Sequence, residues 1–370
     1  MPLNNNITCI FSPAKDLNMF VKNAVEYYLS NKENYDIIMT RSMPEECHII
    51  GLKIKQINSN ITWIASFGDP IGNNPFVLKA LKSGNPYSLT TVLRSGSSIK
   101  SLISIKRLLK SLIFKKRSKK AYNSYVAVKN LLESEIVSKC DYIICNSSYE
   151  QDYIANNNKI SKDKFIVIPH TYDESLYKNF TLIENEKIVF TYVGHLDDIR
   201  TPRLLLKALA KLKNNHTDLS NKAEFDFYGN MSDSDKLFIL NNDLLDVVHI
   251  HKPISYIESL NIMQKSDWLI HIDANLFDIL DKNIFFAAKL ADYLGSYSKI
   301  FGITMLEGAS AEILRNNNAL TATYSCEEIY NWLYLIIYES FTVNMSPIER
   351  EKYNSKNVVE ILDNLIEGIK

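Results

Sequence analysis

Short apolar runs alternate with longer helical patterns along almost the whole chain of 370 residues. Runs of this kind between turn residues are typical of buried strands, whereas the longer segments repeat their apolar residues at helical spacing. Strands that alternate with helices form parallel sheets, because a parallel crossover needs about a helix's length of chain. The alternation therefore predicts an α/β protein whose parallel sheets are covered by helices.

The elements fall into two successive series. In the first half, strands are predicted at residues 7–11, 35–40, 62–67, 141–145 and 165–168, and helices at 16–29 and 44–57. In the second half, strands are predicted at 188–193, 224–228, 247–249, 268–272 and 299–303, and helices at 202–212 and 358–369. The polar and acidic stretch 171–187 is the candidate linker between them. We therefore expect two doubly wound domains that are joined near residue 180.

The formal charge is zero, which argues against a dedicated nucleic-acid-binding protein. This zero hides an asymmetry: residues 1–180 carry 24 basic and 15 acidic side chains, a net +9, and residues 181–370 carry 18 and 27, a net −9. No apolar stretch reaches the roughly twenty residues of a spanning helix, and the N-terminus lacks the features of a signal peptide. Five cysteines without a C-x-x-C pair indicate neither zinc nor a disulfide framework. We expect a cytoplasmic protein, or one attached to a membrane from the cytoplasmic side.

One segment concentrates positive charge. Residues 100–120 contain nine basic side chains and no acidic one, interleaved with apolar residues at helical spacing. This pattern predicts a helix that lies on an anionic membrane surface. The alternative is a helix whose apolar face packs on its own domain while its lysines are solvated. No aromatic interleaving or known module points to nucleic acid.

The second series begins with a junction suited to an anion. In FTYVGHLDDIRTPRLLLKAL (190–209), a strand ends at Gly194, a short loop carries Arg200, and a helix follows. Such a junction directs backbone N–H groups at a crevice, and a nearby cation completes a diphosphate site. The alternative is an ordinary strand–helix loop with a surface arginine. The segment resembles the start of the second domain of GT-B glycosyltransferases, where His195 stands at a position often held by Arg and Arg200 at one usually held by Lys.

Two later segments extend the resemblance. HIHKPISYIESLNIMQKSDWLIHID (249–273) resembles the strand, turn, short helix and strand of this family, and NIFFAAKLADYLGSYSKIFGITMLEGASAEIL (283–314) resembles its donor-site helix. The resemblance implies that Lys289 lies by the donor diphosphate, that Asp292 binds the ribose hydroxyls, and that His251 lies near the nucleobase. A carboxylate suits the ribose, since it accepts hydrogen bonds from two neighbouring hydroxyls. Otherwise Lys289 and Asp292 would be ordinary surface charges of a helix.

The chain departs from the retaining group of this family that carries an E-x7-E motif. The position of the first glutamate is Ile284 here, so its role is lost or is supplied by another residue such as Asp281 or Glu307. No convincing D-x-D pair of the metal-dependent class is present. The resemblance therefore implies a metal-independent site without a cofactor, in which cations and helix N-termini stabilise the leaving diphosphate.

The first half resembles the family more loosely. YDIIMTRSMPEECHIIGLKIKQINSNITWIASFGDP (35–70) is similar to the strands and helix on the acceptor side, with Gly68 where Arg is usual and Asp69 and Pro70 as in the family. Asp69 is the candidate catalytic base or anchor of an acceptor hydroxyl. The alternative is a turn-forming Asp-Pro pair. Only about thirty residues precede this segment, so we expect a first domain that is short at its start.

The sequence thus predicts a GT-B fold with two Rossmann-like domains that face each other across a cleft. Residues 1–180 would form the acceptor-side domain, 181–345 the nucleotide-sugar-binding domain, and 346–370 a helix that crosses back to the first domain. We expect a glycosyltransferase that moves a sugar from a donor such as a UDP- or GDP-sugar to a glycan or lipid-linked saccharide, in bacterial surface polysaccharide or glycoconjugate synthesis. The alternatives are a non-catalytic GT-B partner of a glycosyltransferase and a GT-B sugar-nucleotide epimerase.

Overall fold

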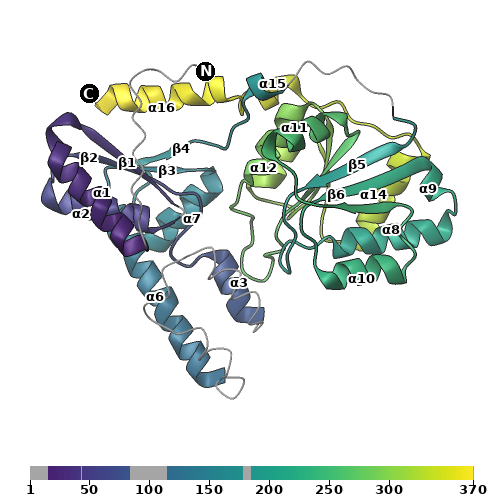
Figure 1. The fold of residues 1–370 in the computed structure, drawn as a ribbon, viewed down its shortest axis with the longest axis horizontal. Coiled ribbons are helices and arrows are strands. Elements are labelled where there is room, and N and C mark those ends of the chain that lie inside the picture. The colour runs from purple at the N-terminus through teal and green to yellow at the C-terminus, as the bar shows by residue number, and fades with distance from the viewer. Residues whose placement is uncertain (1–15, 43, 84–114, 178–184, 370) are drawn as a thin grey trace. The chain divides into compact units, whose positions relative to one another are not determined.

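Two compact α/β units make up the part of the chain that the computed structural model describes, residues 16–42, 44–83, 115–177 and 185–369 (Figure 1). The first unit extends to Cys145 and includes Gln151–Val167, and the second comprises Asn146–Glu150 and Ile168–Lys370. The strand predicted at residues 7–11 lies outside the described residues. So does the basic segment 100–120, except for the backbone of residues 115–120.

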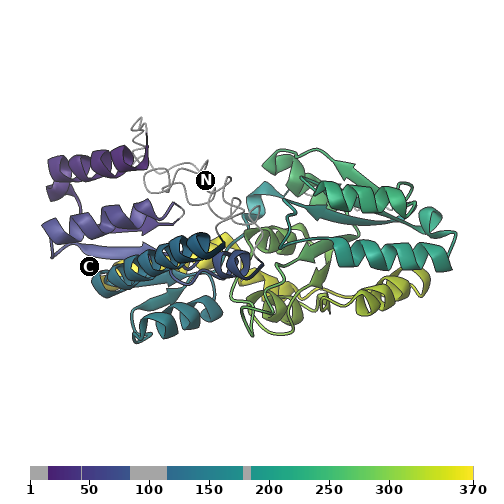
Figure 2. The ribbon, with the colours of Figure 1, turned by 90° about the horizontal axis from the view of Figure 1, so that it is seen from below.

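The first unit has a parallel sheet of four strands in the order β1-β2-β3-β4. The strands are β1 (Ile37–Arg41), β2 (Thr62–Ser66), β3 (Tyr142–Cys145) and β4 (Phe165–Val167). The helices are α1 (Leu17–Asn31), α2 (Glu46–Ile57), α3 (Pro75–Ser83), α6 (Lys115–Lys139) and α7 (Ser148–Asn158), with a short 3₁₀ turn η1 (Lys32–Asn34) after α1 (Figure 2). The predicted strand and helix positions of this half are confirmed to within two residues at most ends.

The core of the first unit lies between one face of the sheet and helices α2 and α6. Trp63 is fully buried and packs with Leu52 of α2 and Ile136 of α6. Gly51 makes this possible, because a Cβ at its position would come within 2.2 Å of the Trp63 ring. The Asp141 carboxylate accepts hydrogen bonds from the Trp63 N–H and from Lys55 Nζ, each at 2.7 Å. These contacts fix the position of β2, whose carboxyl end leads to Asp69.

The loop that follows β2 is held by a buried carboxylate on α6. Glu133 accepts hydrogen bonds from the backbone N–H groups of Ile71 and Gly72, at 2.7 and 2.8 Å, and from Asn158 Nδ2 at 2.8 Å. Burial raises the pKa of Glu133, and these three donors oppose the rise. The loop is therefore anchored immediately after Asp69, which is itself half-buried.

The second unit has a parallel sheet of six strands in the order β10-β9-β8-β5-β6-β7. The strands are β5 (Ile188–Val193), β6 (Ala223–Tyr228), β7 (Val248–His251), β8 (Trp268–Ile272), β9 (Lys299–Ile303) and β10 (Leu320–Ala322). The helices are α8 (Arg203–Asn215), α9 (Leu219–Lys222), α10 (Asp233–Asn241), α11 (Tyr256–Lys265), α12 (Ala288–Ser296), α13 (Ala309–Asn316), α14 (Cys326–Tyr338), α15 (Pro347–Glu351) and α16 (Ser355–Ile369), with a 3₁₀ turn η3 (Glu174–Leu176) ahead of the sheet.

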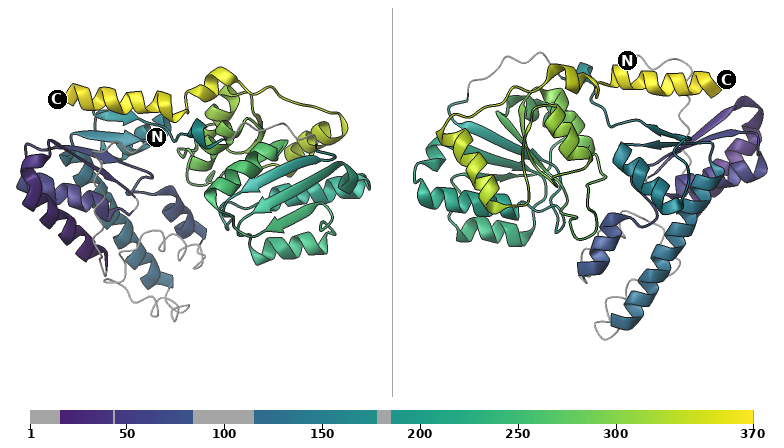
Figure 3. Two further views of the ribbon diagram at one scale, coloured as in Figure 1. Left: turned by 45° about the horizontal axis from the view of Figure 1, so that its top comes forward. Right: turned by 180° about the vertical axis from the view of Figure 1, so that it is seen from behind.

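Helices cover both faces of this sheet (Figure 3). Alternate residues of the strands, such as Phe190 and Ile270, pack against α8 and α14 on one face. On the other face, Leu269 and Ile300 pack against α11, α12 and α13. Strands that are buried on both faces read as continuous apolar runs, which is why the ends of β5, β8 and β9 match the sequence prediction to the residue. The prediction of a parallel α/β architecture in each half is confirmed.

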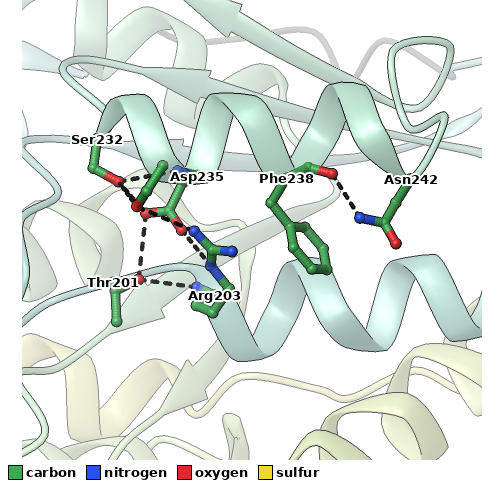
Figure 4. Close-up of polar contacts among 7 residues, drawn as sticks. Thr201, Arg203, Ser232, Asp235, Phe238 and Asn242 are labelled. Carbon is green, nitrogen blue, oxygen red and sulfur yellow. Dashed lines mark hydrogen bonds and ion pairs between the residues drawn. The ribbon is translucent and has the colours of Figure 1, made fainter.

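The start of α8 is fixed by a polar cluster with α10 (Figure 4). Arg203 Nε lies 2.7 Å from Asp235 Oδ1, and the guanidinium lies 4.8 Å from the centre of the Phe238 ring. Ser232 caps α10 by accepting a hydrogen bond from the Asp235 N–H at 3.1 Å. Because Asp235 is buried, its pairing with Arg203 holds the first turn of α8 and so the loop that leads into it.

In the portion of the chain that the structure describes, no helix has the length and hydrophobicity needed to span a bilayer.

Candidate functional site

The sheet of the second unit has its topological switch point at β5, which pairs with β8 on one side and with β6 on the other. In open α/β sheets, ligands bind outside the carboxyl ends of the strands at this point, because the connections diverge there and leave a crevice. Gly194 follows β5, Gly229 follows β6, and Asp273 follows β8. The candidate site is built around these three positions.

Two glycines bring the backbone close together at this edge. Gly194 and Gly229 have φ angles of 135° and 139°, which favour glycine. A Cβ on Gly229 would lie 2.1 Å from the Gly194 carbonyl oxygen, and a Cβ on Gly194 would lie 3.1 Å from Lys289 Nζ. A side chain at Gly229 would collide with the Gly194 backbone, and one at Gly194 would fill the space beside the Lys289 amine. The predicted site residues Gly194 and Lys289 are therefore brought together.

The loop between Gly194 and α8 is organised by a carboxylate. Asp197 Oδ1 accepts hydrogen bonds from the backbone N–H groups of Ile199 and Arg200, at 2.8 and 2.7 Å. The Asn275 N–H donates to the Ile199 carbonyl at 3.1 Å and so ties this loop to the segment after β8. Arg200 is half-buried, and its Nε is buried without a hydrogen-bond partner among the described residues.

Lys289 lies in the first turn of α12, with its amine directed at Tyr192 of β5. Lys289 Nζ donates to Tyr192 Oη and lies 4.0 Å from the centre of that ring. Burial of the amine, and then the positive charge of Arg200, lower the pKa of Lys289 well below its ordinary value, while Asp273 and Asp197 act in the opposite direction. Lys289 thus lies beside Gly194 and under the influence of Arg200, and among the described residues neither basic group is paired with a carboxylate, an arrangement that a bound anion would stabilise.

Asp273 forms a buried polar cluster below these cations. Its carboxylate accepts hydrogen bonds from His271 Nε2 at 2.9 Å, Asn283 Nδ2 at 2.8 Å and Thr304 Oγ1 at 2.6 Å. Burial alone would raise the pKa of Asp273, but the charge and hydrogen bond of His271, the bond from Thr304 and the charge of Arg200 hold it at about 2. Asp273 is therefore a fixed negative charge within reach of Arg200 and Lys289.

Asp292 lies one turn along α12 from Lys289, where its carboxylate already has a partner. Tyr256 Oη, at the start of α11, donates to Asp292 Oδ1 at 2.8 Å, and Tyr177 Oη donates to the Asp292 carbonyl at 2.8 Å. Burial raises the pKa of Asp292, and the Tyr256 hydrogen bond partly offsets this. The Tyr256 ring is 53% exposed, so it covers the carboxylate from the solvent side without being packed in the core.

The side chains of the other predicted residues make no described contact with Arg200, Lys289 or Asp292. His195 is exposed, and its carbonyl, rather than its ring, is engaged, by Tyr192 Oη at 3.1 Å. His251 stacks on Tyr228 and lies 2.7 Å from Asp226 Oδ1 through Nε2. Glu307 is exposed and forms an ion pair with Lys282 at 2.7 Å. Asp69 belongs to the first unit, where it follows β2.

The sequence analysis missed several residues of the site, namely Tyr192, Tyr256, His271 and Asp273. A signal existed for Asp273, because an acidic residue directly after a predicted strand lies at the carboxyl edge of a parallel sheet. The roles of Tyr192 and Tyr256 depend on which distant side chains they contact, and no local pattern carries that information.

Ile284, at the position of the missing first glutamate, is buried, and its carbonyl accepts a hydrogen bond from Ser147 Oγ at 2.7 Å. Among the described residues, no group of three or more His, Cys, Asp or Glu could hold a metal ion.

The lowered pKa of Lys289 predicts how the stability of the protein depends on pH. The pKa of Lys289 in the folded chain lies well below its ordinary value of 10.5. Between the folded-state pKa and 10.5, the unfolded chain therefore binds more protons than the folded chain. The free energy of unfolding consequently rises with pH in this range. We expect Lys289→Met to raise the melting temperature at neutral pH by a few degrees, with a gain that shrinks toward pH 10. Calorimetry across this range checks it, with the exposed Lys236→Met as the control. A lower melting temperature for Lys289→Met at neutral pH would contradict the assignment.

Comparisons with known proteins bear on the fold. No protein-family model and no curated protein matches the sequence. Among solved structures, sucrose-phosphate synthase from Thermosynechococcus elongatus aligns with 97% of this chain and 80% of its own, at 13% identity and a TM-score of 0.63. A glycosyltransferase from Rickettsia africae aligns with 97% and 84%, at 15% identity and a TM-score of 0.62. HepE from Anabaena, solved in complex with UDP, aligns with 95% and 81%, at 12% identity and a TM-score of 0.60.

These structures share both parallel-sheet units with this chain over nearly its full length. At such low identity, a match of this kind establishes the fold and leaves the chemistry to the site itself. The chain has the GT-B fold of glycosyltransferases, as the sequence resemblance predicted.

Proposed function

We propose that this protein is a metal-independent glycosyltransferase that uses a nucleotide-sugar donor. One observation carries the proposal: Lys289 lies beside the Gly194 backbone at the switch point of the second unit, Arg200 is close enough to lower the pKa of Lys289, and neither is paired to a carboxylate among the described residues. The diphosphate of a nucleotide sugar would supply the missing negative charge. The fold supports the same reading, since HepE was solved with UDP and the Rickettsia africae protein is a glycosyltransferase.

The residues divide the work of a transfer reaction. Arg200 and Lys289 would bind the diphosphate, and their charges would stabilise the leaving group as its bond to the sugar breaks. Asp292 would accept hydrogen bonds from the ribose hydroxyls, one turn along the same helix. The two cations supply the positive charge that a divalent metal provides in other glycosyltransferases. His195, His251 and Glu307 would form outer parts of the donor site, and Asp69 in the first unit would act on the acceptor.

Loss of either cation should weaken donor binding. We expect Lys289→Ala and Arg200→Ala each to reduce the affinity for the nucleotide by about 10-fold or more, which corresponds to ~1.4 kcal/mol. Thermal-shift titrations of the unmodified protein with UDP-, GDP- and dTDP-sugars identify the donor, and the variants are then titrated with it. Lys211→Ala is the control, because Lys211 forms an exposed ion pair with Glu327 on the outer helices. Absence of binding to any nucleotide sugar would overturn the proposal.

The same variants separate an enzyme from a non-catalytic partner. A glycosyltransferase slowly hydrolyses its donor when water replaces the acceptor, so release of the free nucleotide reports on chemistry. If Lys289 stabilises the leaving diphosphate, Lys289→Ala lowers this release even at saturating donor. Binding of a nucleotide sugar without any release by the unmodified protein would favour the non-catalytic alternative.

Loss of the Asp292 carboxylate should weaken binding of the nucleoside part of the donor and leave binding of its phosphates nearly unchanged. We expect Asp292→Ala to weaken binding of UDP, or of the nucleoside diphosphate identified by the panel, by about 10-fold, because two charge-assisted hydrogen bonds are lost. Binding of inorganic pyrophosphate should change less than twofold. Isothermal titration calorimetry with both ligands checks this, and Lys289→Ala serves as the contrast, since it should weaken both. Equal losses for both ligands in Asp292→Ala would contradict the ribose role.

The basic segment 100–120 suggests where the enzyme works. Its nine basic and no acidic side chains, interleaved with apolar residues, suit attachment to the cytoplasmic face of an anionic membrane, where a lipid-linked saccharide acceptor would be found. This supports a role in bacterial surface polysaccharide or glycoconjugate synthesis. We expect the protein to float with vesicles that contain anionic lipid and not with neutral ones. Flotation that persists after the nine basic residues are changed to Gln would disprove attachment through this segment.

A further inference from the structure

The first unit contains a buried carboxylate, that of Glu46, without a hydrogen-bond partner in the part of the chain that the structure describes. Glu46, at the start of α2, is 2% exposed, and neither of its carboxylate oxygens has a hydrogen-bond partner among the described residues. The other buried glutamates of this unit are satisfied: Glu45 pairs with Lys129, and Glu133 accepts three hydrogen bonds. Buried polar groups in folded proteins are nearly always paired, so an exception calls for an explanation.

The position of Glu46 is that of a ligand-binding group. It lies at the N-terminus of a helix of 12 residues, where the backbone dipoles favour negative charge. This helix begins just after β1, so Glu46 lies at the carboxyl edge of the sheet of the first unit. Asp69 follows the neighbouring strand β2 at the same edge. The two strand ends are tied together, since the Ser42 N–H donates to the Ser66 carbonyl at 3.1 Å and the Gly68 N–H to Ser42 Oγ at 3.0 Å.

The surroundings of Glu46 explain why it stays unpaired. The ammonium group of Lys129 on α6 is engaged by Glu45, the residue before Glu46. Burial lowers the pKa of Lys129 to about 8, which shows that this ion pair lies in a poorly solvated place. The side chains of Tyr125 on α6 and of Cys47 interact electrostatically with Glu46. Pro44, Cys47 and Tyr125 around it are each only half-buried, so the carboxylate lies just beneath the surface.

We propose that Glu46 binds the acceptor by accepting a hydrogen bond from one of its hydroxyl groups. The inference rests on the proposed glycosyltransferase function and extends it to the first unit. A saccharide offers hydroxyl donors in abundance, and a carboxylate with both oxygens free can accept from two adjacent hydroxyls. Without an acceptor, the unpaired buried carboxylate of Glu46 destabilises the protein. A bound acceptor would remove this destabilisation, because its hydroxyl group would donate a hydrogen bond to Glu46. Such a conflict between stability and function is characteristic of binding sites.

The stability of variants gives the first test, because it needs no ligand. We expect Glu46→Gln and Glu46→Leu to raise the melting temperature by a few degrees, since each removes an unsatisfied buried charge. Glu45→Gln should lower it, because Lys129 loses its partner. Glu135→Gln on the exposed side of α6 is the matched control and should leave it unchanged. A lower melting temperature for both Glu46 variants would show that Glu46 has a structural role and would overturn the proposal.

The second test measures acceptor use with the nucleotide sugar identified by the donor panel. The probes are the methyl glycosides of glucose, galactose and N-acetylglucosamine, and the readout is their stimulation of nucleotide release over hydrolysis. We expect Glu46→Gln to reduce this stimulation at least 10-fold while Glu135→Gln retains it. Undiminished stimulation in Glu46→Gln, or none by any probe in the unmodified protein, would count against a hydroxyl-binding role. Failure of the unmodified protein to bind any nucleotide sugar would instead sink the proposed function, and UDP titration separates the two cases.

Discussion

Two basic side chains that lie close together, with no directly paired carboxylate among the described residues, are the feature on which the candidate site of the second unit depends. Arg200 and Lys289 repel each other, and burial of the Lys289 amine adds to the cost, as its lowered pKa records. Several contacts are needed to keep them in place. The Asp197 turn fixes the backbone of Arg200, the Arg203–Asp235 pair fixes the helix that follows, and Tyr192 lies beneath the Lys289 amine. A site so arranged gains most when a doubly charged anion arrives.

Asp273 moderates the repulsion between Arg200 and Lys289. Its pKa of about 2 means that it stays ionised across the physiological range, so it attracts both cations at all relevant pH values. It does not pair with them, because His271, Asn283 and Thr304 occupy its oxygens. The attraction therefore acts through space and leaves the guanidinium and the amine available. A directly paired carboxylate would compete with the diphosphate for the same donors, whereas a fixed charge at a distance only moderates the repulsion.

The fold was predictable where a local sequence pattern marks a strand or helix. Candidate site residues were predictable only where they lie next to such a strand or helix. Strands buried on both faces, such as β5 and β8, are continuous apolar runs, and their ends were found to the residue. The three-residue strand β10 was missed, because so short a run cannot be distinguished from a loop. Gly194, Arg200 and Lys289 could be proposed as site residues because they flank regular elements in a recognisable order. Tyr256 and Glu46 could not be, since the significance of each lies in whether a partner from a distant segment meets it.

The excess positive charge of the first half of the chain is concentrated in one segment. The net +9 of residues 1–180 equals the nine basic side chains of the segment 100–120, so the rest of that half carries 15 basic and 15 acidic side chains. The first half is therefore neutral apart from one segment, and a polybasic patch interacts with an anionic surface only over about a Debye length, ~8 Å at physiological salt. The same screening would allow the second half, at −9, to bind the diphosphate that we propose. Surface acids farther away than this have little influence, and two cations within hydrogen-bonding distance of the diphosphate would determine the local potential.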